Sequence, residues 1–198
     1  MQRGDLPQPG GRPARAREQE APSLIERALR QRVALLCAPA GAGKTAACSQ
    51  WAATTSQRVI WVTLDAEDDQ GWFWALVYSG LERAAVIPVE TLRALQDEPA
   101  LDFPLMLADL ARSFAEPAVL VIDNVHAITD AGALCGLDLL IRNAPGCLHF
   151  LLCGRQLPQL KLARLRAAGE LTVVEIGGPA AESPGRQRLA VAPPAVPV

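Results

Sequence analysis

The sequence lacks the cysteine and histidine patterns that hold zinc or build a disulfide framework. Its five cysteines and two histidines form no C-x-x-C pair and no paired His/Cys spacing, so neither a zinc site nor a set of disulfides is predicted. Cys37 and Cys153 end or interrupt apolar runs and are expected to be small core residues. Free thiols of this kind are typical of a protein from a reducing cytosol.

A strong charge of either sign and a long hydrophobic run are also missing. The formal net charge of the 198 residues is −2, which argues against a chain built to bind nucleic acid through its phosphates. No apolar run approaches the length of about 18 residues that a membrane span needs, and the N-terminus lacks the apolar segment of a secretory signal. We therefore expect a cytoplasmic globular protein with no membrane partner.

What the sequence does contain is a phosphate-binding pattern. The apolar run Val33–Cys37 predicts a strand, the loop that follows ends in Gly-Lys-Thr, and Ala46–Ala53 predicts a helix. In this arrangement the backbone N–H groups of the loop and the N-terminal dipole of the helix converge on an anion. The expected nucleotide-binding residues are Ala38, Pro39, Ala40, Gly41, Ala42, Gly43, Lys44, Thr45 and Ala46.

Two side chains of this loop carry specific chemistry. Lys44 supplies a positive charge for the outer phosphates, and the hydroxyl of Thr45 is a ligand for Mg²⁺. The pattern G-x-x-x-x-G-K-[ST] has glycine at its first position, where this chain has Ala38. The methyl group is tolerable if φ at Ala38 is below zero, since only a positive φ makes glycine nearly obligatory.

A second motif is the apolar run at 117–124, which ends in Asp123 and Asn124. It predicts a strand that is buried on both faces and presents one carboxylate at its C-terminal end, the edge at which open α/β sheets bind ligands. Together with a phosphate loop, such an aspartate is typical of the Walker B element, which holds Mg²⁺ through the metal's water shell. We therefore predict that Thr45 and Asp123 form a magnesium site; the alternative is an aspartate that only caps a turn or helix.

The rest of the chain alternates between strand and helix patterns. A first helix is predicted from Ser23, as N-cap with Glu26 as its capping-box partner, to about Gln31. Further strands are predicted at 58–64, 148–153 and 171–176, and further helices at 71–81, 105–115, 131–143 and 160–168. Five strands that alternate with helices imply a parallel sheet in a three-layer α/β fold.

Two local details accompany this pattern. Asp68 or Asp69 is expected to cap the helix at 71–81, and a short helix is expected around Leu92–Leu95. The three aromatic residues at 72–74 indicate a buried junction, since core packing is commoner than a base-stacking platform at helical spacing.

Together these stretches resemble the nucleotide-binding domain of MalT-like regulators, the large ATP-binding LuxR-family transcription factors of the STAND class. The resemblance covers roughly residues 23–176, and its stretches occur in the family's order: APAGAGKT with SQWA, WVTLDAEDDQGWFW, VLVIDNVHAI, LHFLLCGRQLP and LARLRAAGEL. It implies a three-layer P-loop NTPase fold of the ASCE type, with a five-stranded, mostly parallel sheet and helices on both faces. In that fold the strand that ends near Arg155 separates the two Walker strands.

The resemblance also implies roles for individual residues. Lys44 and Thr45 would bind phosphate and Mg²⁺, Asp123 would be the Walker B carboxylate, and Arg155 would be a sensor arginine near the terminal phosphate. Asn124 stands at the catalytic position where the family has a second acidic residue that orients or deprotonates the attacking water. Since an amide cannot accept that proton at neutral pH, ATP and Mg²⁺ are expected to bind, and hydrolysis is expected to be slow or absent.

The two ends of the chain differ from its middle. Residues 1–21 and 177–198 are rich in Pro, Gly and Arg or Ala, so we expect a disordered leader and a disordered tail around a nucleotide-binding domain at 22–176. The family continues into a sensor region and a DNA-binding helix-turn-helix. We therefore expect a chain truncated before these parts, with no direct binding of DNA, while self-association, as in STAND proteins, stays open.

Three functions are compatible with these patterns. The first is an ATP-binding switch domain of a transcription regulator, at most a weak ATPase. The second is a small P-loop kinase, whose acceptor lid only the region Arg155–Arg166 could supply. The third is a degenerate interaction module that binds no nucleotide, for which Ala38 and Asn124 are the best support.

Overall fold

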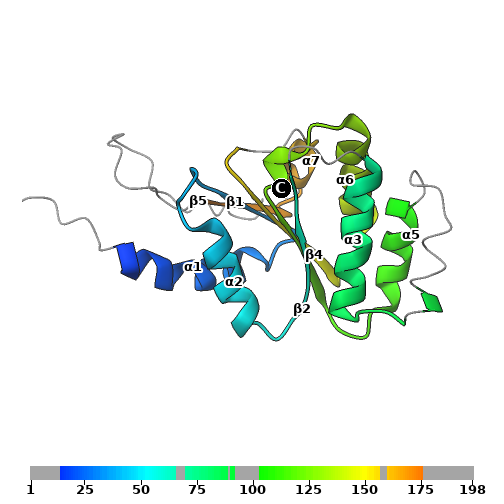
Figure 1. Ribbon diagram of the computed structural model, residues 1–198, viewed down its shortest axis with the longest axis horizontal. Coiled ribbons are helices and arrows are strands. Elements are labelled where there is room, and N and C mark those ends of the chain that lie inside the picture. Colours follow the sequence, from blue (N-terminus) through cyan, green and yellow to red (C-terminus); the bar gives the residue numbers. More distant parts are fainter. Residues whose placement is uncertain (1–13, 66–69, 89, 92–102, 157–159, 176–198) are drawn as a thin grey trace, which may run out of the picture.

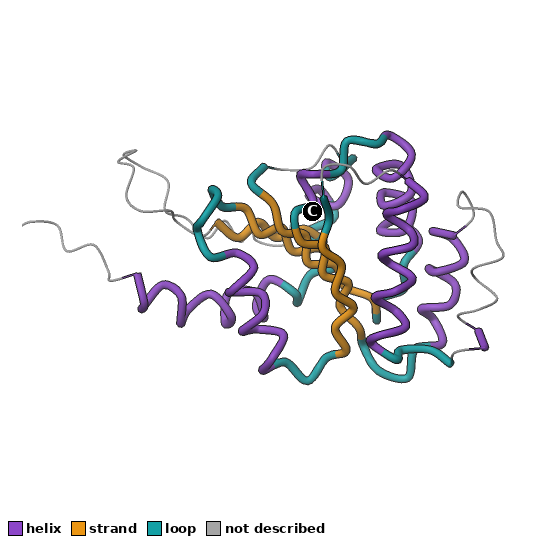
Figure 2. The backbone as a smooth tube through the Cα atoms, viewed as in Figure 1, coloured by secondary structure: helices purple, strands orange, loops and turns teal. Residues whose placement is uncertain are grey.

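The computed structural model describes residues 14–65, 70–88, 90–91, 103–156 and 160–175. Its centre is a five-stranded parallel sheet with the strand order β2-β3-β4-β1-β5. The strands run through the middle of the molecule with helices on both sides (Figure 2), which confirms the predicted α/β architecture. They are β1 Val33–Cys37, β2 Arg58–Thr63, β3 Ala118–Asp123, β4 Leu148–Gly154 and β5 Leu171–Glu175.

Helices cover both faces of this sheet. α1 and α2 lie on one face, whereas α3, α5 and α6 lie on the other (Figure 1). No helix in the described ranges is long and apolar enough to cross a membrane. The helices are α1 Ala14–Ala28, α2 Lys44–Thr54, α3 Gln70–Ala84, α5 Phe103–Leu110, α6 Ala131–Asn143 and α7 Ala163–Ala167, with 3₁₀ turns η1 Ala111–Ser113 and η2 Val125–Ala127.

Burial on both faces explains why the central strands are apolar throughout. All six residues of β3 are buried, because the strand lies inside the sheet with helices on each side. Side chains of β1 alternate between the faces with a period of two. Val33 and Leu35 join the core with α3, α5 and α6, whereas Ala34 and Leu36 join the core with α1 and α2. Packing in both cores therefore holds the C-terminal end of β1, and the loop that follows it, in place.

Several predicted boundaries agree with the structure, and others differ. β1 and α6 have the predicted bounds, and β3 ends at Asp123 as predicted. The helix predicted at 105–115 is instead α5 followed by the 3₁₀ turn η1. The short helix predicted at Leu92–Leu95 and the cap predicted at Asp68 or Asp69 lie outside the described residues.

The predicted start of the first helix is wrong. α1 begins at Ala14 rather than at Ser23, and Pro22 lies inside it. The segment before Pro22 is rich in Ala, Arg and Glu, which are strong helix formers, so the helix continues upstream. Glu26 is then no capping-box partner. Its Oε2 accepts a hydrogen bond of 2.6 Å from Nε1 of Trp51, which joins α1 to α2.

The aromatic segment at the start of α3 is only partly buried. Phe73 and Trp74 are buried and meet edge to face, with ring centroids 4.6 Å apart. Trp72 is 58% exposed, so the prediction of a junction that buries all three rings is wrong at this residue. Because a helix has about 3.6 residues per turn, three consecutive side chains cannot all face one core.

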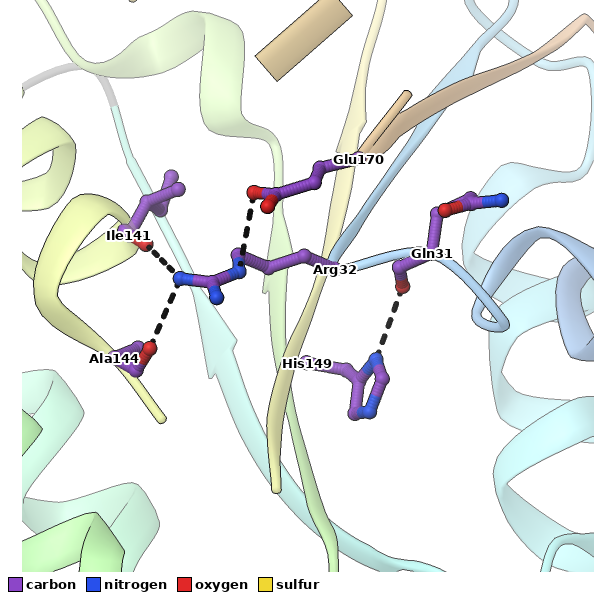
Figure 3. Close-up of polar contacts among 6 residues, drawn as sticks. All are labelled: Gln31, Arg32, Ile141, Ala144, His149 and Glu170. Atoms are coloured by element: carbon purple, nitrogen blue, oxygen red, sulfur yellow. Dashed lines mark hydrogen bonds and ion pairs between the residues drawn. The ribbon is translucent and has the colours of Figure 1, made fainter. Parts of the chain in front are cut away.

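Arg32 ties together the N-terminal edge of the sheet. Its Nη1 donates to the carbonyl oxygens of Ile141 at 3.3 Å and Ala144 at 2.9 Å, where α6 ends. Its Nε lies 3.3 Å from Oε2 of Glu170, just before β5 (Figure 3). The last carbonyls of a helix have no partner within the helix, and a cation there complements the helix dipole. One guanidinium thus joins the starts of β1 and β5 to the end of α6.

We expect the substitution Arg32→Ala to lower the free energy of unfolding by about 1–3 kcal/mol, because two partly buried carbonyl oxygens lose their charged donor. Urea unfolding followed by circular dichroism measures this loss. Arg58→Ala is the matched control, since it removes an exposed ion pair with Glu116 and should change stability by no more than about 0.5 kcal/mol. Equal losses in both variants would contradict this role of Arg32.

Candidate functional site

The phosphate loop joins β1 to α2 with two glycines in the left-handed region. Gly41 has φ 74° and Gly43 has φ 81°, which glycine adopts without steric cost. Among the described non-glycine residues, only Ala85 and Asn124 have a positive φ. Ala38 therefore meets the condition under which its methyl group is tolerable, and its N–H donates to the carbonyl of Gly154 at 3.2 Å.

Lys44, the first residue of α2, folds back over this loop. Its Nζ donates to the carbonyl oxygens of Ala38 at 2.8 Å and Pro39 at 2.9 Å. The side chain is buried, so these charge-assisted hydrogen bonds offset the cost of removing the ammonium from water. The loop thus holds its one cation in a defined position.

Thr45 and Asp123 are brought into direct contact although they are far apart in the sequence. Oγ1 of Thr45 donates to Oδ2 of Asp123 at 2.8 Å, and Oδ1 of the same carboxylate accepts the N–H of Asn124 at 2.9 Å. Asp123 is 2% exposed, so a buried carboxylate is satisfied on both oxygens.

The donor set of this pair fits Mg²⁺, which takes oxygen ligands. The ion commonly uses one or two protein oxygens and fills its remaining positions with phosphate oxygens and water. No cluster of three or more His, Cys, Asp or Glu side chains that could hold a metal occurs within the described residues. A metal held by Thr45 and Asp123 would therefore take its other ligands from water and from the phosphate oxygens of a nucleotide.

Asn124 has a structural task that the sequence did not indicate. It has φ 59° and ψ 35°, a left-handed conformation that asparagine adopts more readily than most residues. Its Nδ2 donates to the carbonyl oxygen of Leu64 at 3.4 Å, at the end of the neighbouring strand β2. The side chain therefore links the ends of β2 and β3, and as an amide it offers no proton acceptor of useful basicity.

Arg155 follows β4 directly and lies beside His126 of η2. The backbone N–H of Arg155 donates to Nδ1 of His126 at 3.4 Å. Burial lowers the pKa of His126 below its usual value, and the positive charges of Arg155 and Lys44 lower it further, while Asp123 opposes them. His126 thus belongs to the same electrostatic neighbourhood as the predicted site residues.

All of these groups gather at the C-terminal edge of the sheet. β4 lies between β1 and β3, so the strand that ends near Arg155 separates the two Walker strands, as predicted. Lys44 and Thr45 follow β1, while Asp123 and Asn124 end β3. Parallel strands bring their carboxyl ends to one edge, which is where α/β sheets bind ligands.

Two cysteines pack beneath the phosphate loop. Sγ of Cys48 on α2 lies 3.2 Å from Sγ of Cys153 on β4, and both side chains are buried. Hydrogen bonding to Cys48 and burial raise the pKa of the Cys153 thiol well above its usual value. Cys153 is thus a core residue as predicted, whereas Cys37 is only partly buried. The pair is a small contact that lets α2 approach β4 closely.

A cavity of about 130 Å³ lies at the opposite edge, lined by Arg58, Ala85, Val86, Ala115 and Glu116. It is smaller than the roughly 300–1,000 Å³ of ligand pockets, and its polar lining is an exposed ion pair. This cavity is therefore too small for a ligand site of ordinary size.

A family model described as an AAA domain matches residues 27–161, more than half of the chain. The chain belongs to the AAA domain family. This AAA domain is a P-loop ATPase fold, and nucleotide and Mg²⁺ use are general in that family. The matched range contains the phosphate loop, Asp123 and Arg155.

Among similar solved structures, two with TM-scores above 0.5 share the fold of this AAA domain. The ORC1 protein of Aeropyrum pernix, solved in complex with DNA, has a TM-score of 0.54 at 16% identity, over 84% of this chain and 45% of that chain. A Walker-type ATPase of Pyrococcus abyssi has 0.52 at 13%, over 70% and 45%. A STAND protein with a tetratricopeptide repeat sensor from Pyrococcus horikoshii has 0.49 at 16%, over 81% and 23%. The chain spans less than half of each of these proteins.

Sequence reasoning missed one residue of the site. In the sequence analysis His126 is only one letter of the stretch VLVIDNVHAI. In the structure its Nδ1 accepts the backbone N–H of Arg155, and the charges of Lys44 and Asp123 shift its pKa. The available signal was its position directly after a strand that ends in aspartate. The sequence did not reveal that the turn after β3 meets the end of β4.

The loop geometry predicts that removing a methyl group at Ala38 and adding one at Gly41 both destabilise the protein. Ala38→Gly is expected to lower the free energy of unfolding by about 1 kcal/mol, because glycine adds backbone entropy to the unfolded chain. Gly41→Ala is also expected to destabilise by about 1–2 kcal/mol, because an L-residue at φ 74° is strained, although an added Cβ meets nothing within 4 Å.

Urea unfolding measures both changes. Gly146→Ala is the control, since its added Cβ also meets nothing within 4 Å and its φ is not positive; it should be neutral or slightly stabilising. An Ala38→Gly variant more stable than the wild type would mean that alanine strains the loop.

Proposed function

We propose that this AAA domain is the ATP- and ADP-binding switch domain of a MalT-like transcription regulator of the LuxR family, and that it hydrolyses ATP slowly or not at all. The observation that carries the nucleotide site is the hydrogen bond of 2.8 Å between Thr45 and Asp123, next to Lys44 and the left-handed glycines of the loop. The regulator type is supported by the five stretches that occur in that family's order along residues 23–176.

Binding follows from what the loop and its neighbours offer an anion. The N–H groups of the loop and of the first turn of α2 carry partial positive charge at a helix N-terminus. Lys44 would exchange its carbonyl partners for phosphate oxygens, a stronger charge-assisted contact. Arg155, exposed at the end of β4, would add a second cation for the outermost phosphate.

The metal position follows from the same geometry. Thr45 and Asp123 would hold Mg²⁺ between them and the outer phosphates, with Asp123 acting partly through the metal's water shell. When bound, Mg²⁺ would neutralise phosphate charge. Oγ1 of Thr45 and Oδ2 of Asp123 already lie next to each other at the edge of the sheet, so the backbone would not have to move for them to hold the metal.

Slow hydrolysis follows from Asn124. Its Nδ2 is engaged by the carbonyl of Leu64, and an amide cannot take a proton from water at neutral pH. The site then holds a triphosphate for a long time, which suits a switch better than an enzyme. We place this unit at residues 22–176 and extend it at the N-terminal side by the first residues of α1, which begins at Ala14. The sensor and DNA-binding parts of such regulators would lie outside it.

Removing the charge of Lys44 tests the site. We expect Lys44→Ala to weaken ADP·Mg²⁺ binding by about 100-fold, as loss of a charge-assisted contact of about 2–3 kcal/mol requires. Isothermal titration calorimetry measures the affinity. Lys161→Ala is the matched control, because Lys161 is the chain's other lysine and is exposed. Equal affinity of Lys44→Ala and the wild type would refute the assignment, and transfer of phosphate to an acceptor would favour a kinase.

Restoring a carboxylate at Asn124 tests the hydrolysis proposal. We expect Asn124→Asp to raise single-turnover ATP hydrolysis, because the carboxylate can accept a proton, and to lower the melting temperature, because it cannot donate to Leu64. Asn143→Asp is the control, since it also breaks an amide-to-carbonyl bond, of 2.8 Å to Leu139, but far from the site. Fast turnover by the wild type would contradict the proposal.

A further inference from the structure

His126 lies where the turn after β3 meets the end of β4. Gly154 allows this contact: a Cβ added there would lie 3.1 Å from Cγ1 of Val125 and 3.5 Å from the backbone N of His126. The next residue, Arg155, donates its backbone N–H to Nδ1 of His126. The imidazole is therefore held by the strand that carries the candidate sensor arginine.

The hydrogen bond fixes which nitrogen of the ring can donate. Because Nδ1 accepts the N–H of Arg155, it carries no proton, so the neutral ring carries its proton on Nε2. The ring is only partly buried. It thus offers one N–H donor in addition to the cations of the site.

Three charged groups on three elements act on this ring. They are Arg155 after β4, Lys44 on α2 and Asp123 on β3, and the two cations lower the pKa of His126 while the carboxylate raises it. These are the groups that would hold the outermost phosphate and its metal. The chain's other histidine, His149, lies at the opposite edge of the sheet, where its Nδ1 meets the carbonyl of Gln31 (Figure 3).

We propose that His126 binds the terminal phosphate of a nucleoside triphosphate. Its Nε2–H donates a hydrogen bond to that phosphate, while its Nδ1 accepts the backbone N–H of Arg155. His126 then acts together with Arg155 to distinguish a triphosphate from a diphosphate at this site. The inference rests on the proposed function, since it requires that the phosphate loop bind a nucleotide. It adds a contact that a diphosphate cannot make.

Calorimetry with two ligands tests the proposal. We compare ADP·Mg²⁺ with an ATP analogue whose terminal phosphate is joined through nitrogen, using the wild type and three variants. His126→Ala should lose about tenfold in affinity for the analogue, as one hydrogen bond to a charged group predicts, with ADP affinity within about twofold. His126→Gln, whose amide places an N–H near the Nε2 position, should keep most of the affinity for the analogue. His149→Gln should change neither affinity.

The outcomes separate this inference from the function beneath it. If the wild type binds neither ligand, the proposed function fails and His126 has no phosphate to bind. If the wild type binds both and His126→Ala weakens both equally or neither, the function stands and the role of His126 is refuted. Circular dichroism identifies a variant that fails to fold, and in that case the NMR titration of the wild-type protein decides.

A spectroscopic readout gives a second decision. The chain has two histidines, so proton–carbon NMR resolves both rings, and His149→Gln assigns them. A bound terminal phosphate offsets the positive charges of Lys44 and Arg155, so the pKa of His126 should rise with the analogue and rise less with ADP. An equal pKa with both ligands would overturn the proposal.

Discussion

The hydrogen bond between Thr45 and Asp123 depends on a strand that contributes neither residue. β1 and β3 are not neighbours, because β4 lies between them. The distance between the ends of β1 and β3 is therefore set by the spacing of the pairs β1–β4 and β4–β3. Small residues on β4 keep this edge closed: Cys153 packs on Cys48, and Gly154 leaves room for Val125. The separation of two oxygens is thus fixed by the packing of a third strand.

Much of the fold could be predicted because its strands are buried on both faces. β1 is an apolar run that leads into a glycine-containing loop, and β3 is an apolar run that ends in an aspartate. Such runs have few alternatives in a chain of this length. The loop glycines and Asp123 could be placed for the same reason, since each follows directly from a strand. Ala38 was understandable in advance because its tolerance depends on one backbone angle.

What could not be predicted depends on contacts between distant segments. α1 begins upstream of Pro22 because the helix propensity of the residues before it outweighs the cost of one proline inside the helix. The capping pattern at Ser23 gives no information on this balance. The bond from Asn124 to Leu64 and the approach of His126 to Arg155 join different strand ends. Neither has a periodicity in the sequence. The exposure of Trp72 likewise depends on which arc of α3 faces the core.

The carbonyl oxygens of the phosphate loop compete with a bound anion for the ammonium group of Lys44. Two carbonyl oxygens hold the ammonium, so an incoming anion has to displace them and is favoured only by the difference between the two sets of contacts. A small anion that contacts only the lysine would make a small gain in binding free energy by this exchange. A nucleotide, which also engages the loop N–H groups and the metal, makes a large one. If the loop binds a nucleotide as proposed, it would thereby discriminate against inorganic phosphate and sulfate through hydrogen bonds within the protein.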